Sequence, residues 1–340
     1  MKTAYEDIYT HVNNTLSMLL HNKDSLVIII GISGGIDSTV LLHILHDLKK
    51  TIYKKKLIIH AAHIQHGWST LKKEWEKEEQ EELNFCKTIC HEKNIPLHTH
   101  IITNIDQHKT DGSYESQARN IRRLFFKHVQ EKLQADYICL GHHADDQIET
   151  FFIRLLRGSS LSGLGCMQNI SEESYWRPLL MVSKKTIITA GQEKNISYCI
   201  DTGNTSEKFL RNRIRNILIP TIKNIDERYK ITILSTINNL QAACKVINCF
   251  TENEYKRIYN KENKQLIIKD FLLLDIYIQY EILQIILIEI NIKKELFSTS
   301  LYNEIIRFMK NTKSSQHNIE NIHIKKNNMY IIFTLVEKKI

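Results

Sequence analysis

Apolar runs alternate with longer amphipathic segments along the first 200 residues of the chain. The short runs are rich in Ile, Leu, Val and Tyr and end at polar residues, which is typical of buried strands. We predict strands at 26–32, 57–64, 97–103 and 137–141, with a fifth, short strand near Tyr198. Helical spacing of apolar positions predicts helices at about 38–49, 74–94, 114–134 and 144–157. This alternation predicts an α/β fold with a doubly wound parallel sheet, whose ligands bind at the carboxyl ends of the strands.

The pattern changes after Pro220. Residues 221–262 have apolar positions at helical spacing and lack glycine, which predicts a helical connecting region. Strand-like and helical runs mix from 263 to 340, and residues 323–333 read as a hairpin that turns at Asn327 and Asn328. The sequence therefore predicts an α/β domain at 1–220, a connecting region at 221–262 and a small α+β domain at 263–340.

A glycine-containing turn follows the first predicted strand, where residues 33–38 read Ser-Gly-Gly-Ile-Asp-Ser. Two glycines permit a tight turn, and the N–H groups that open the next helix carry the positive end of its dipole. The hydroxyls add donors, and the carboxylate can hold magnesium. The Walker pattern G-x-x-x-x-G-K-[ST] is absent from the sequence. The turn predicts a polyphosphate site made by Ser33, Gly34, Gly35, Ile36, Asp37 and Ser38.

A second polar segment follows the predicted strand at 137–141, where residues 141–150 read Gly-His-His-Ala-Asp-Asp-Gln-Ile-Glu-Thr. It places the carboxylates of Asp145, Asp146 and Glu149 at the opening of a helix. Acids in a first helical turn are often ordinary caps. Because the carboxyl ends of parallel strands share one edge of a sheet, we expect these acids beside the polyphosphate turn, as magnesium ligands or substrate-orienting groups.

The histidines of one predicted strand and the cysteines are residue types that can bind metal ions, but their spacing does not indicate a metal site. His60 and His63 lie three apart on a predicted strand and so point to opposite faces, which disfavours joint metal ligation. The seven cysteines include no C-x-x-C pair and do not form the framework of a disulfide scaffold. We interpret Cys86 and Cys90, one helical turn apart, as reduced and partly buried thiols.

The positive charge of the chain lies in its C-terminal part. Residues 1–210 carry 25 Lys and Arg against 25 Asp and Glu, whereas residues 211–340 carry 21 against 13, so the net +8 arises there. This excess suits a polyanionic partner, although a solvated Lys-rich surface accounts for it equally well. No apolar stretch is long enough to span a membrane, and the N-terminus lacks the layout of a secretory signal. We therefore expect a cytoplasmic protein without a membrane partner.

The Ser33–Ser38 turn resembles the PP-loop of ATP pyrophosphatases, and the order of the other motifs resembles tRNA(Ile)-lysidine synthetases. These motifs are His63-Ile-Gln-His66-Gly67, Glu115 to Arg119 with Arg122 and Arg123, Gly141 to Thr150, Asp201-Thr-Gly-Asn204, and Arg211 to Arg215 before Ile219-Pro220. The resemblance covers residues 31–220. The last 120 residues carry no comparable motif.

This resemblance implies a ligase that forms a C–N bond, with ATP and Mg2+ as cofactors. The C2 oxygen of the wobble cytidine in the CAU anticodon of tRNA(Ile) attacks ATP, which gives an adenylated base and diphosphate. The ε-amine of L-lysine then attacks C2 and releases AMP. The lysidine that results changes codon specificity from AUG to AUA and amino-acid identity from Met to Ile.

The resemblance also implies roles for individual residues. The catalytic set is Asp37, Arg119, His142, Asp145, Asp146 and Glu149. The ATP site adds His63, Arg119 and Gly141 to the residues of the turn, and Asp37 and Asp146 hold the metal. Arg122, Arg211, Arg213 and Arg215 contact tRNA, although the last three suit ATP phosphate equally well. Whether a carboxylate of the acidic segment, His142 or His143 orients or deprotonates lysine stays open, as does the oligomeric state, including a homodimer.

Two alternative functions remain. A PP-loop tRNA thiolase would share the adenylation step and then deliver sulfur, but such an enzyme is expected to carry paired cysteines. A catalytically silent tRNA-binding protein would need neither the intact turn nor the intact acidic segment. Small-molecule PP-loop ligases usually add an ammonia-generating domain, for which the chain has no motif.

Overall fold

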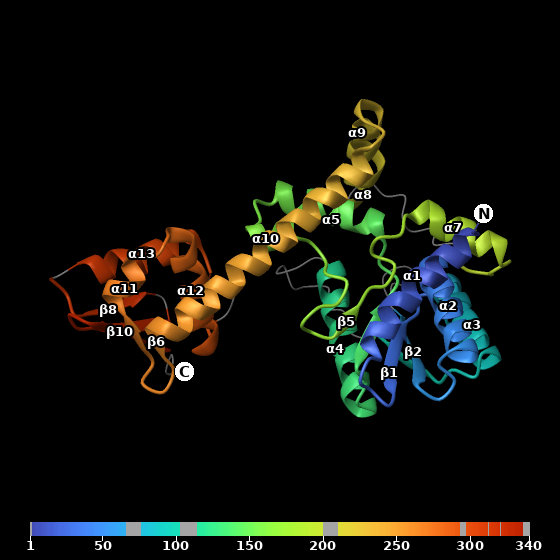
Figure 1. Cartoon of the computed structure of the whole chain (residues 1–340), viewed down its shortest axis with the longest axis horizontal. Coiled ribbons are helices and arrows are strands. Elements are labelled where there is room, and N and C mark those ends of the chain that lie inside the picture. The colour runs from blue at the N-terminus through green and yellow to red at the C-terminus, as the bar shows by residue number, and fades with distance from the viewer. Residues whose placement is uncertain are drawn as a thin grey trace. The chain divides into compact units, whose positions relative to one another are not determined.

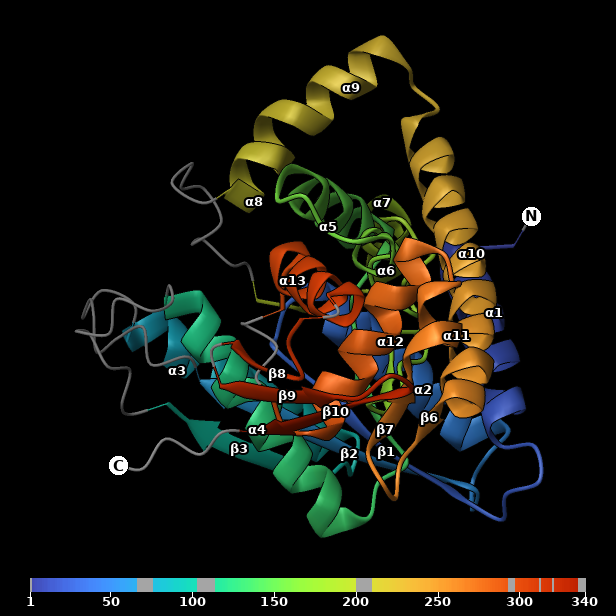
Figure 2. The same ribbon diagram turned by 90° about the vertical axis from the view of Figure 1, so that its left-hand side faces the viewer.

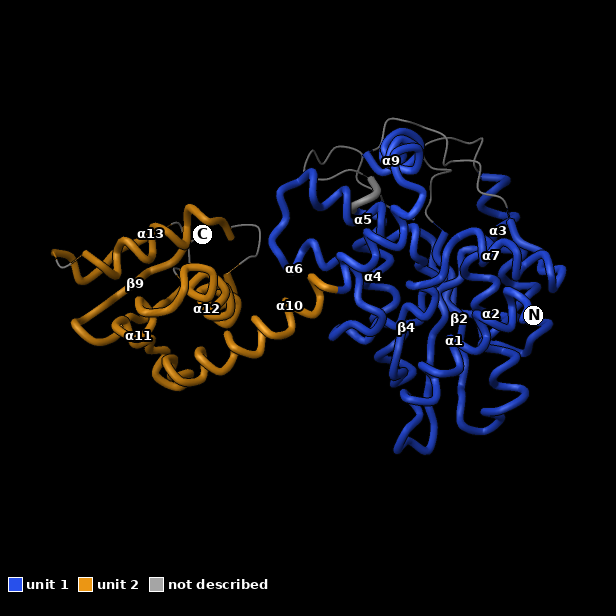
Figure 3. The backbone as a smooth tube through the Cα atoms, turned by 45° about the horizontal axis from the view of Figure 1, so that its top comes forward, with its two compact units in different colours: residues 1–238 blue, residues 239–340 orange. Residues whose placement is uncertain are grey.

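The computed structural model divides the chain into two compact units, residues 1–238 and 239–340 (Figure 3). It describes residues 2–65, 76–102, 114–199, 210–292, 297–311, 313–319 and 321–335, without the side chains of 114–116. Each unit has its own apolar core. We describe the two units separately.

The first unit is built on a parallel sheet, as predicted. Its described strands are β1 (Leu26–Gly31), β2 (Leu57–Gln65), β3 (Leu97–Ile101), β4 (Tyr137–Leu140) and β5 (Tyr175–Trp176). Their order in the sheet is β3-β2-β1-β4-β5, and these strands pair with one another in parallel. The chain therefore leaves β1 on one side toward β2 and returns on its other side at β4. That reversal puts the carboxyl ends of β1 and β4 side by side, where ligands bind in such sheets.

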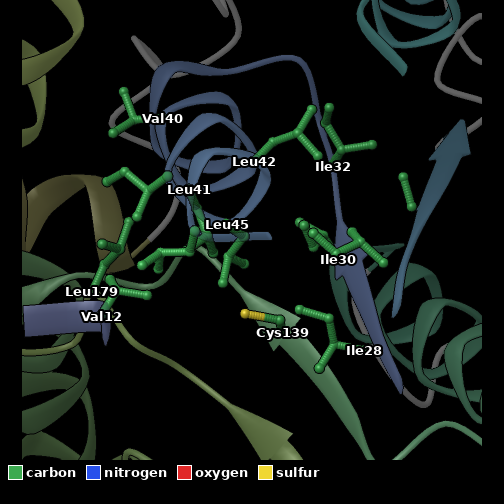
Figure 4. Close-up of a cluster of buried hydrophobic side chains, with 14 of the residues drawn as sticks. Val12, Ile28, Ile30, Ile32, Val40, Leu41, Leu42, Leu45, Cys139 and Leu179 are labelled. Carbon is green, nitrogen blue, oxygen red and sulfur yellow. The ribbon is translucent and has the colours of Figure 1, made fainter. Parts of the chain in front are cut away.

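Helices cover both faces of this sheet (Figure 1). They are α1 (Ala4–Leu19), α2 (Ile36–Thr51), α3 (Glu76–Glu92), α4 (Tyr114–Leu133), α5 (Ala144–Leu156), α6 (Leu161–Leu164) and α7 (Lys184–Glu193). Alternation along β1 separates two cores: Ile28 and Ile30 pack with α1, α2, α3 and α7, whereas Ile29 packs with α4. Figure 4 shows the larger core, where Ile28 and Ile30 lie near Cys139 of β4 and Leu45 of α2.

The prediction of a strand near Tyr198 is wrong. Tyr198 lies outside any strand and is exposed, and the fifth strand of the sheet is the two-residue β5. Trp176 of β5 is fully buried, and it pairs with Cys139 of β4. A strand of two residues that ends two positions before Pro178 is too short to produce an alternating pattern, so only its place in the core defines it.

Helix α1 was not predicted from the sequence, although two local signals are present. Thr3 and Glu6 form a capping box, and Tyr5, Ile8, Val12 and Leu16 form a buried stripe at helical spacing. The helix packs against α2 and α7 and so completes one face of the sheet.

Residues 210–258 are helical almost throughout, in agreement with the predicted connecting region. They form α8 (Leu210–Arg213), a π-helical turn η4 (Ile214–Leu218), α9 (Ile219–Ile225) and α10 (Tyr229–Ile258). The division between the two compact units, at 238 and 239, falls within α10. The domain limits drawn from the sequence at 220 and 262 stay predictions.

The second unit holds an antiparallel sheet, the C-terminal part of α10 and three further described helices, which confirms the small α+β module. The strands are β6 (Tyr259–Asn260), β7 (Gln265–Ile267), β8 (Gln316–Ile319), β9 (Ile322–Lys326) and β10 (Tyr330–Leu335), and the helices are α11 (Ile268–Leu272), α12 (Ile276–Glu289) and α13 (Thr299–Lys310). Figure 2 shows β8, β9 and β10 side by side. The predicted hairpin is present, because β9 and β10 pair across Asn327 and Asn328. None of the helices described in either unit is long and apolar enough to cross a membrane.

Candidate active site at the carboxyl edge of the sheet

The predicted polyphosphate turn joins β1 to α2. Gly34 has a φ of +84°, a conformation that side chains with a Cβ rarely adopt, so glycine allows the chain to reverse here. Gly35 then precedes α2, and its position offers no side-chain cap to the helix. The N–H groups of the first turn of α2 are therefore left for a ligand at the positive end of the helix dipole.

Two hydroxyl groups are fixed at the mouth of this turn. The Oγ atoms of Ser33 and Ser38 lie 3.2 Å apart, and the Ser38 hydroxyl donates to the Gly35 carbonyl over 3.0 Å. His63, from the neighbouring strand β2, contacts the residue that precedes the turn. Its side chain is buried, and its Nδ1 lies 2.9 Å from the Ile32 carbonyl oxygen. Burial lowers the pKa of His63, so the neutral ring donates this hydrogen bond at neutral pH.

The end of β4 lies directly against the turn, as expected for its place in the sheet. A Cβ added at Gly141 would lie 3.0 Å from the backbone nitrogen of Ser38 and 3.1 Å from the carbonyl carbon of Asp37. A side chain at this position would crowd the backbone at the start of α2, and glycine allows the close approach without any shift. This contact between backbones brings the acidic segment to the polyphosphate turn.

His143 connects the two parts of the site. It caps α5 in a capping box with Asp146, whose Oδ2 accepts a hydrogen bond from the His143 N–H over 3.0 Å. The Nε2 atom of His143 lies 3.5 Å from Asp146 Oδ2 and 3.9 Å from Asp37 Oδ1. The predicted catalytic residues Asp37 and Asp146 thus both lie close to the same ring nitrogen of His143.

Two lysines that sequence reasoning missed neutralise the carboxylates nearest the turn. Lys184 opens α7, and its Nζ contacts both carboxylate oxygens of Asp37 at 2.8 and 2.7 Å. The Lys184 backbone N–H donates to Asp145 over 2.9 Å, and the Nζ of Lys230, from α10, also donates to Asp145. The only sequence signal was Ser183, which caps α7 through the Thr186 N–H.

Two arginines predicted to contact tRNA bind the remaining acids. Arg211 places Nε 2.6 Å from Glu149 Oε2 and Nη2 2.6 Å from Asp146 Oδ1. Arg215 binds the other side of Glu149, with Nε 2.6 Å from Oε1. Glu149 is only 2% exposed, so these two guanidinium groups compensate a buried charge. Arg213, which lies between them in sequence, is exposed.

The surrounding charges decide the protonation of the acids. Burial by itself raises the pKa of Asp145, but hydrogen bonds from Lys184 and Lys230 outweigh it and hold that pKa below its usual value. Burial also opposes ionisation of Asp146, and the charges of His143 and Arg211 reverse this effect and lower its pKa. Both groups are therefore ionised at neutral pH. They are better suited to bind cations than to accept protons.

The other two predicted catalytic residues are His142, which follows β4, and Arg119, which belongs to α4. Burial lowers the pKa of His142 to about 4, and the positive charges of Arg177 and Arg122 act in the same direction, so His142 is neutral at pH 7. Arg119 is exposed on α4. Three parts of the predicted motifs lie outside the described residues: His66 with Gly67, the side chain of Glu115, and 201–204.

The magnesium prediction can be compared with the ligands present. Within the described ranges, no three His, Cys, Asp or Glu side chains are placed to hold a metal ion. Magnesium bound with ATP commonly takes only one or two protein carboxylates, since phosphates and waters fill its other positions. Asp37, 26% exposed at the mouth of the turn, fits such a role.

The cysteines agree with the sequence interpretation. Cys86 and Cys90 are free and buried on α3. Burial raises the pKa of both thiols, that of Cys90 to about 11. Thiols that stay protonated are poor nucleophiles and metal ligands.

Comparisons with known proteins agree with this geometry. Residues 8–222 match the PP-loop domain family. Over 229 residues the chain is 30% identical to a tRNA(Ile)-lysidine synthase from Nitrosomonas europaea, covering 66% of this chain and 46% of that protein. It is 30% identical over 322 residues to the tRNA(Ile)-lysidine synthase of Clostridium acetobutylicum, covering 91% of this chain and 66% of that protein. The chain therefore spans about half to two thirds of the length of these curated relatives.

A solved structure shows the same fold. The U34-tRNA thiolase NcsA from Methanococcus maripaludis, with its [4Fe-4S] cluster, superposes with a TM-score of 0.58 at 18% identity, over 70% of this chain and 78% of that chain. The PP-loop match spans β1, the Ser33–Ser38 turn, the acidic segment and both arginines that bind Glu149. This chain belongs to the PP-loop domain family.

Proposed function

We propose that this protein is a tRNA(Ile)-lysidine synthetase, a ligase that joins L-lysine to C2 of the wobble cytidine in the CAU anticodon of tRNA(Ile). The observation that carries the proposal is the contact between Gly141 and the start of α2, which unites a polyphosphate turn with an acidic helix terminus. The tRNA(Ile)-lysidine synthases among the relatives support this reading over other PP-loop activities. The expected products are lysidine, AMP and diphosphate.

The first step is adenylation of the base. The N–H groups of α2 and the hydroxyls of Ser33 and Ser38 would bind the diphosphate end of ATP, leaving the α-phosphorus open to the cytosine oxygen. Asp37, with Asp146 close by, would hold Mg2+, whose chemistry is to neutralise charge on the phosphates. Lys184 adds a positive charge at the same place through its contact with Asp37.

The second step is attack by the lysine amine. The contact of Lys230 with Asp145 supports a role for this carboxylate in receiving an alkylammonium group. Because the pKa values of Asp145 and Asp146 are lowered, we assign these acids to orientation of lysine and not to removal of its proton. Glu149 is paired with Arg211 and Arg215, and we assign it a structural role that attaches α8 and η4 to α5.

We also propose that residues 263–340 help to position the tRNA and that the protein acts in the cytoplasm. The supporting observation is the positive excess of residues 211–340, which would favour a polyanion. Arg213 is exposed and has the chemistry to contact RNA phosphate.

The decisive experiment measures transfer of labelled lysine to a tRNA(Ile) transcript with a CAU anticodon, in the presence of ATP and Mg2+. A matched transcript carries uridine at the wobble position. We expect label on the first transcript only, with equal amounts of AMP and diphosphate released. Cytidine-dependent AMP release without lysine transfer would contradict the proposal and point to another nucleophile, with sulfur tested first. The buried, protonated thiols of Cys86 and Cys90 argue against that thiolase outcome.

A further inference from the structure

A group of basic side chains lies on the β4–β5 side of the site and is used by neither proposed step. His142 follows the end of β4, and Arg177 follows the end of β5, the next strand in the sheet. Arg122 comes from α4. Arg177 has its guanidinium carbon 5.3 Å from the centre of the Tyr175 ring. These groups occupy the carboxyl edge of the sheet, because parallel strands end at the same edge.

The pattern of α4 explains why Arg122 faces the sheet. Ala118 and Phe126 are buried, and Arg122 lies one helical turn from each, on the same side of the helix. Phe126 packs at the end of β1, where a Cβ added at Gly31 would lie 3.1 Å from its ring. Arg122 therefore extends from the inner side of α4, and it is half-buried.

In the part of the chain that the structure describes, this cluster has positive charge without matching negative charge. Among the described residues, neither Arg122 nor Arg177 has a carboxylate within ion-pair distance. The nearby acids are already engaged, since Glu173 pairs with Arg123 at 2.5 Å and Asp146 pairs with Arg211 at 2.6 Å. Burial lowers the pKa of Arg122 and Arg177, and the neighbouring charge of Arg119 lowers both further. Partly buried, unpaired guanidinium groups are costly, and an anion would compensate them.

Two buried nitrogen atoms also lack partners. The Nε of Arg177 and the Nδ1 of His142 are both shielded from water without a hydrogen bond from the described chain. The Arg177 Nη1 is held by the Gln168 carbonyl at 3.0 Å, which fixes the guanidinium plane. Buried donors without partners are rare in folded proteins and call for a ligand or water.

We propose that Arg122, Arg177 and His142 form an anion pocket that binds an RNA phosphodiester next to the reacting base. The inference rests on the proposed function for its RNA. A phosphate oxyanion could also come from ATP, but the α2 turn already offers N–H and hydroxyl donors for the ATP phosphates at the end of β1. His142 and Arg177 follow β4 and β5, and Arg122 comes from α4, which packs on β1, β2 and β4. A phosphodiester bound there would hold the anticodon while its base reaches the ATP.

The first experiment compares Arg122→Gln and Arg177→Gln with Arg123→Gln in the full-length protein. Arg123 lies on the same helix, but it is exposed and paired with Glu173, so its variant is a matched loss of one charge. Binding of a CAU anticodon stem-loop is measured across a salt series, and ATP affinity is measured separately. We expect about tenfold weaker RNA binding for each pocket variant and a salt slope reduced by about one. ATP affinity and the Arg123→Gln variant should stay near the wild-type values.

A second experiment leaves the protein unchanged and so does not depend on how the variants fold. A stem-loop with one neutral methylphosphonate beside the wobble nucleotide should bind wild-type protein about tenfold more weakly than the natural RNA. For the Arg177→Gln variant, the affinities for the modified and the natural RNA should be nearly equal, because this variant already lacks the contact with that phosphate. Arg177→Lys, which keeps the charge without the planar fork, should recover part of the affinity.

The outcomes separate the two proposals. Loss of ATP affinity with unchanged RNA affinity would overturn the RNA assignment and give the pocket to a nucleotide phosphate. Variants that match wild type in both assays would overturn the pocket altogether. Wild-type protein that neither binds nor modifies the CAU stem-loop would overturn the proposed function and, with it, the RNA ligand of this pocket.

Discussion

At the scale of single residues, the contact between Asp37 and Lys184 links the two ends of the candidate site. Asp37 was predicted from its position in the turn, and it lies at the mouth of that turn. Lys184 is 147 positions away in sequence and belongs to no motif, yet its Nζ binds both carboxylate oxygens of Asp37. The sequence therefore revealed the carboxylate of Asp37, but only the folded chain revealed the lysine that pairs with it.

Replacing Asp37 tests the assignment of ATP to the turn. We expect Asp37→Asn to abolish diphosphate release, because the carboxylate that would hold Mg2+ is lost while the shape of the side chain is kept. Affinity for tRNA should change less than twofold. The two quantities are measured by diphosphate release and by filter binding of the transcript. Loss of tRNA binding together with activity would show that the turn serves RNA and not ATP.

Lys184 should be important for adenylation and not for tRNA binding. We expect Lys184→Met to slow diphosphate release about a hundredfold, since a positive charge is removed from beside the phosphates as negative charge develops. Lys185→Met is the matched control, because Lys185 is the next residue of α7 and is exposed. Rates at saturating ATP and tRNA give the comparison. Equal rates for the two variants would remove Lys184 from the site.

At the scale of elements, the arginines of α8 and η4 attach that segment to α5. Sequence reasoning assigned Arg211 and Arg215 to phosphate, whereas in the folded chain both bind Glu149. The assignment to tRNA stays a prediction, which would require these side chains to exchange partners. The alternation of arginines at 211, 213 and 215 could not reveal this, because the partner acids are about 65 positions away and were read as ligands for substrate.

Neutralising Glu149 should loosen this attachment. Glu149→Gln leaves two guanidinium groups without a buried anion, and we expect the free energy of unfolding to fall by about 2 kcal/mol. Backbone amides of 210–218 should exchange hydrogen faster, while those of β1 and α2 stay protected. Urea unfolding and hydrogen exchange provide the two readouts. Unchanged exchange at 210–218 would mean that other contacts hold α8 and η4 in place.

At the scale of the whole molecule, buried histidines should make stability depend on pH. His43 and His142 have pKa values lowered from 6.5 to about 4 by burial, and nearby positive charges add to the effect. The unfolded chain binds protons on these rings at higher pH than the folded chain does. Their contribution is therefore fully present above pH 6.5 and is lost as pH falls from 6.5 toward 4. The lowered pKa values of Asp145 and Asp146 act only below about 4.

Urea unfolding at several pH values measures this effect. Between pH 6 and pH 4.5, His43→Gln should reduce the slope of unfolding free energy against pH by at most about 1.4 kcal/mol per pH unit, the value for one proton. His128→Gln, at an exposed position on α4, should leave the slope as it is. A slope that His43→Gln does not change would show that other groups cause the acid sensitivity.

Local sequence patterns predicted the parallel sheet, most of its helices and the identity of the acidic and glycine-containing motifs. These follow from local rules, because apolar periodicity and turn chemistry act over a few residues. The same patterns also located the β9–β10 hairpin. They did not find β5, since two residues make no pattern.

The identity of the charged groups that pair with one another became visible only in the folded chain. The approach of Gly141 to α2 and the pairing of Lys184 with Asp37 and of Arg211 with Glu149 all join residues that are distant in sequence. Such contacts depend on strand order and on the side of a helix that a residue faces. Both are set by the packing of the whole unit, and a local sequence pattern predicts neither of them.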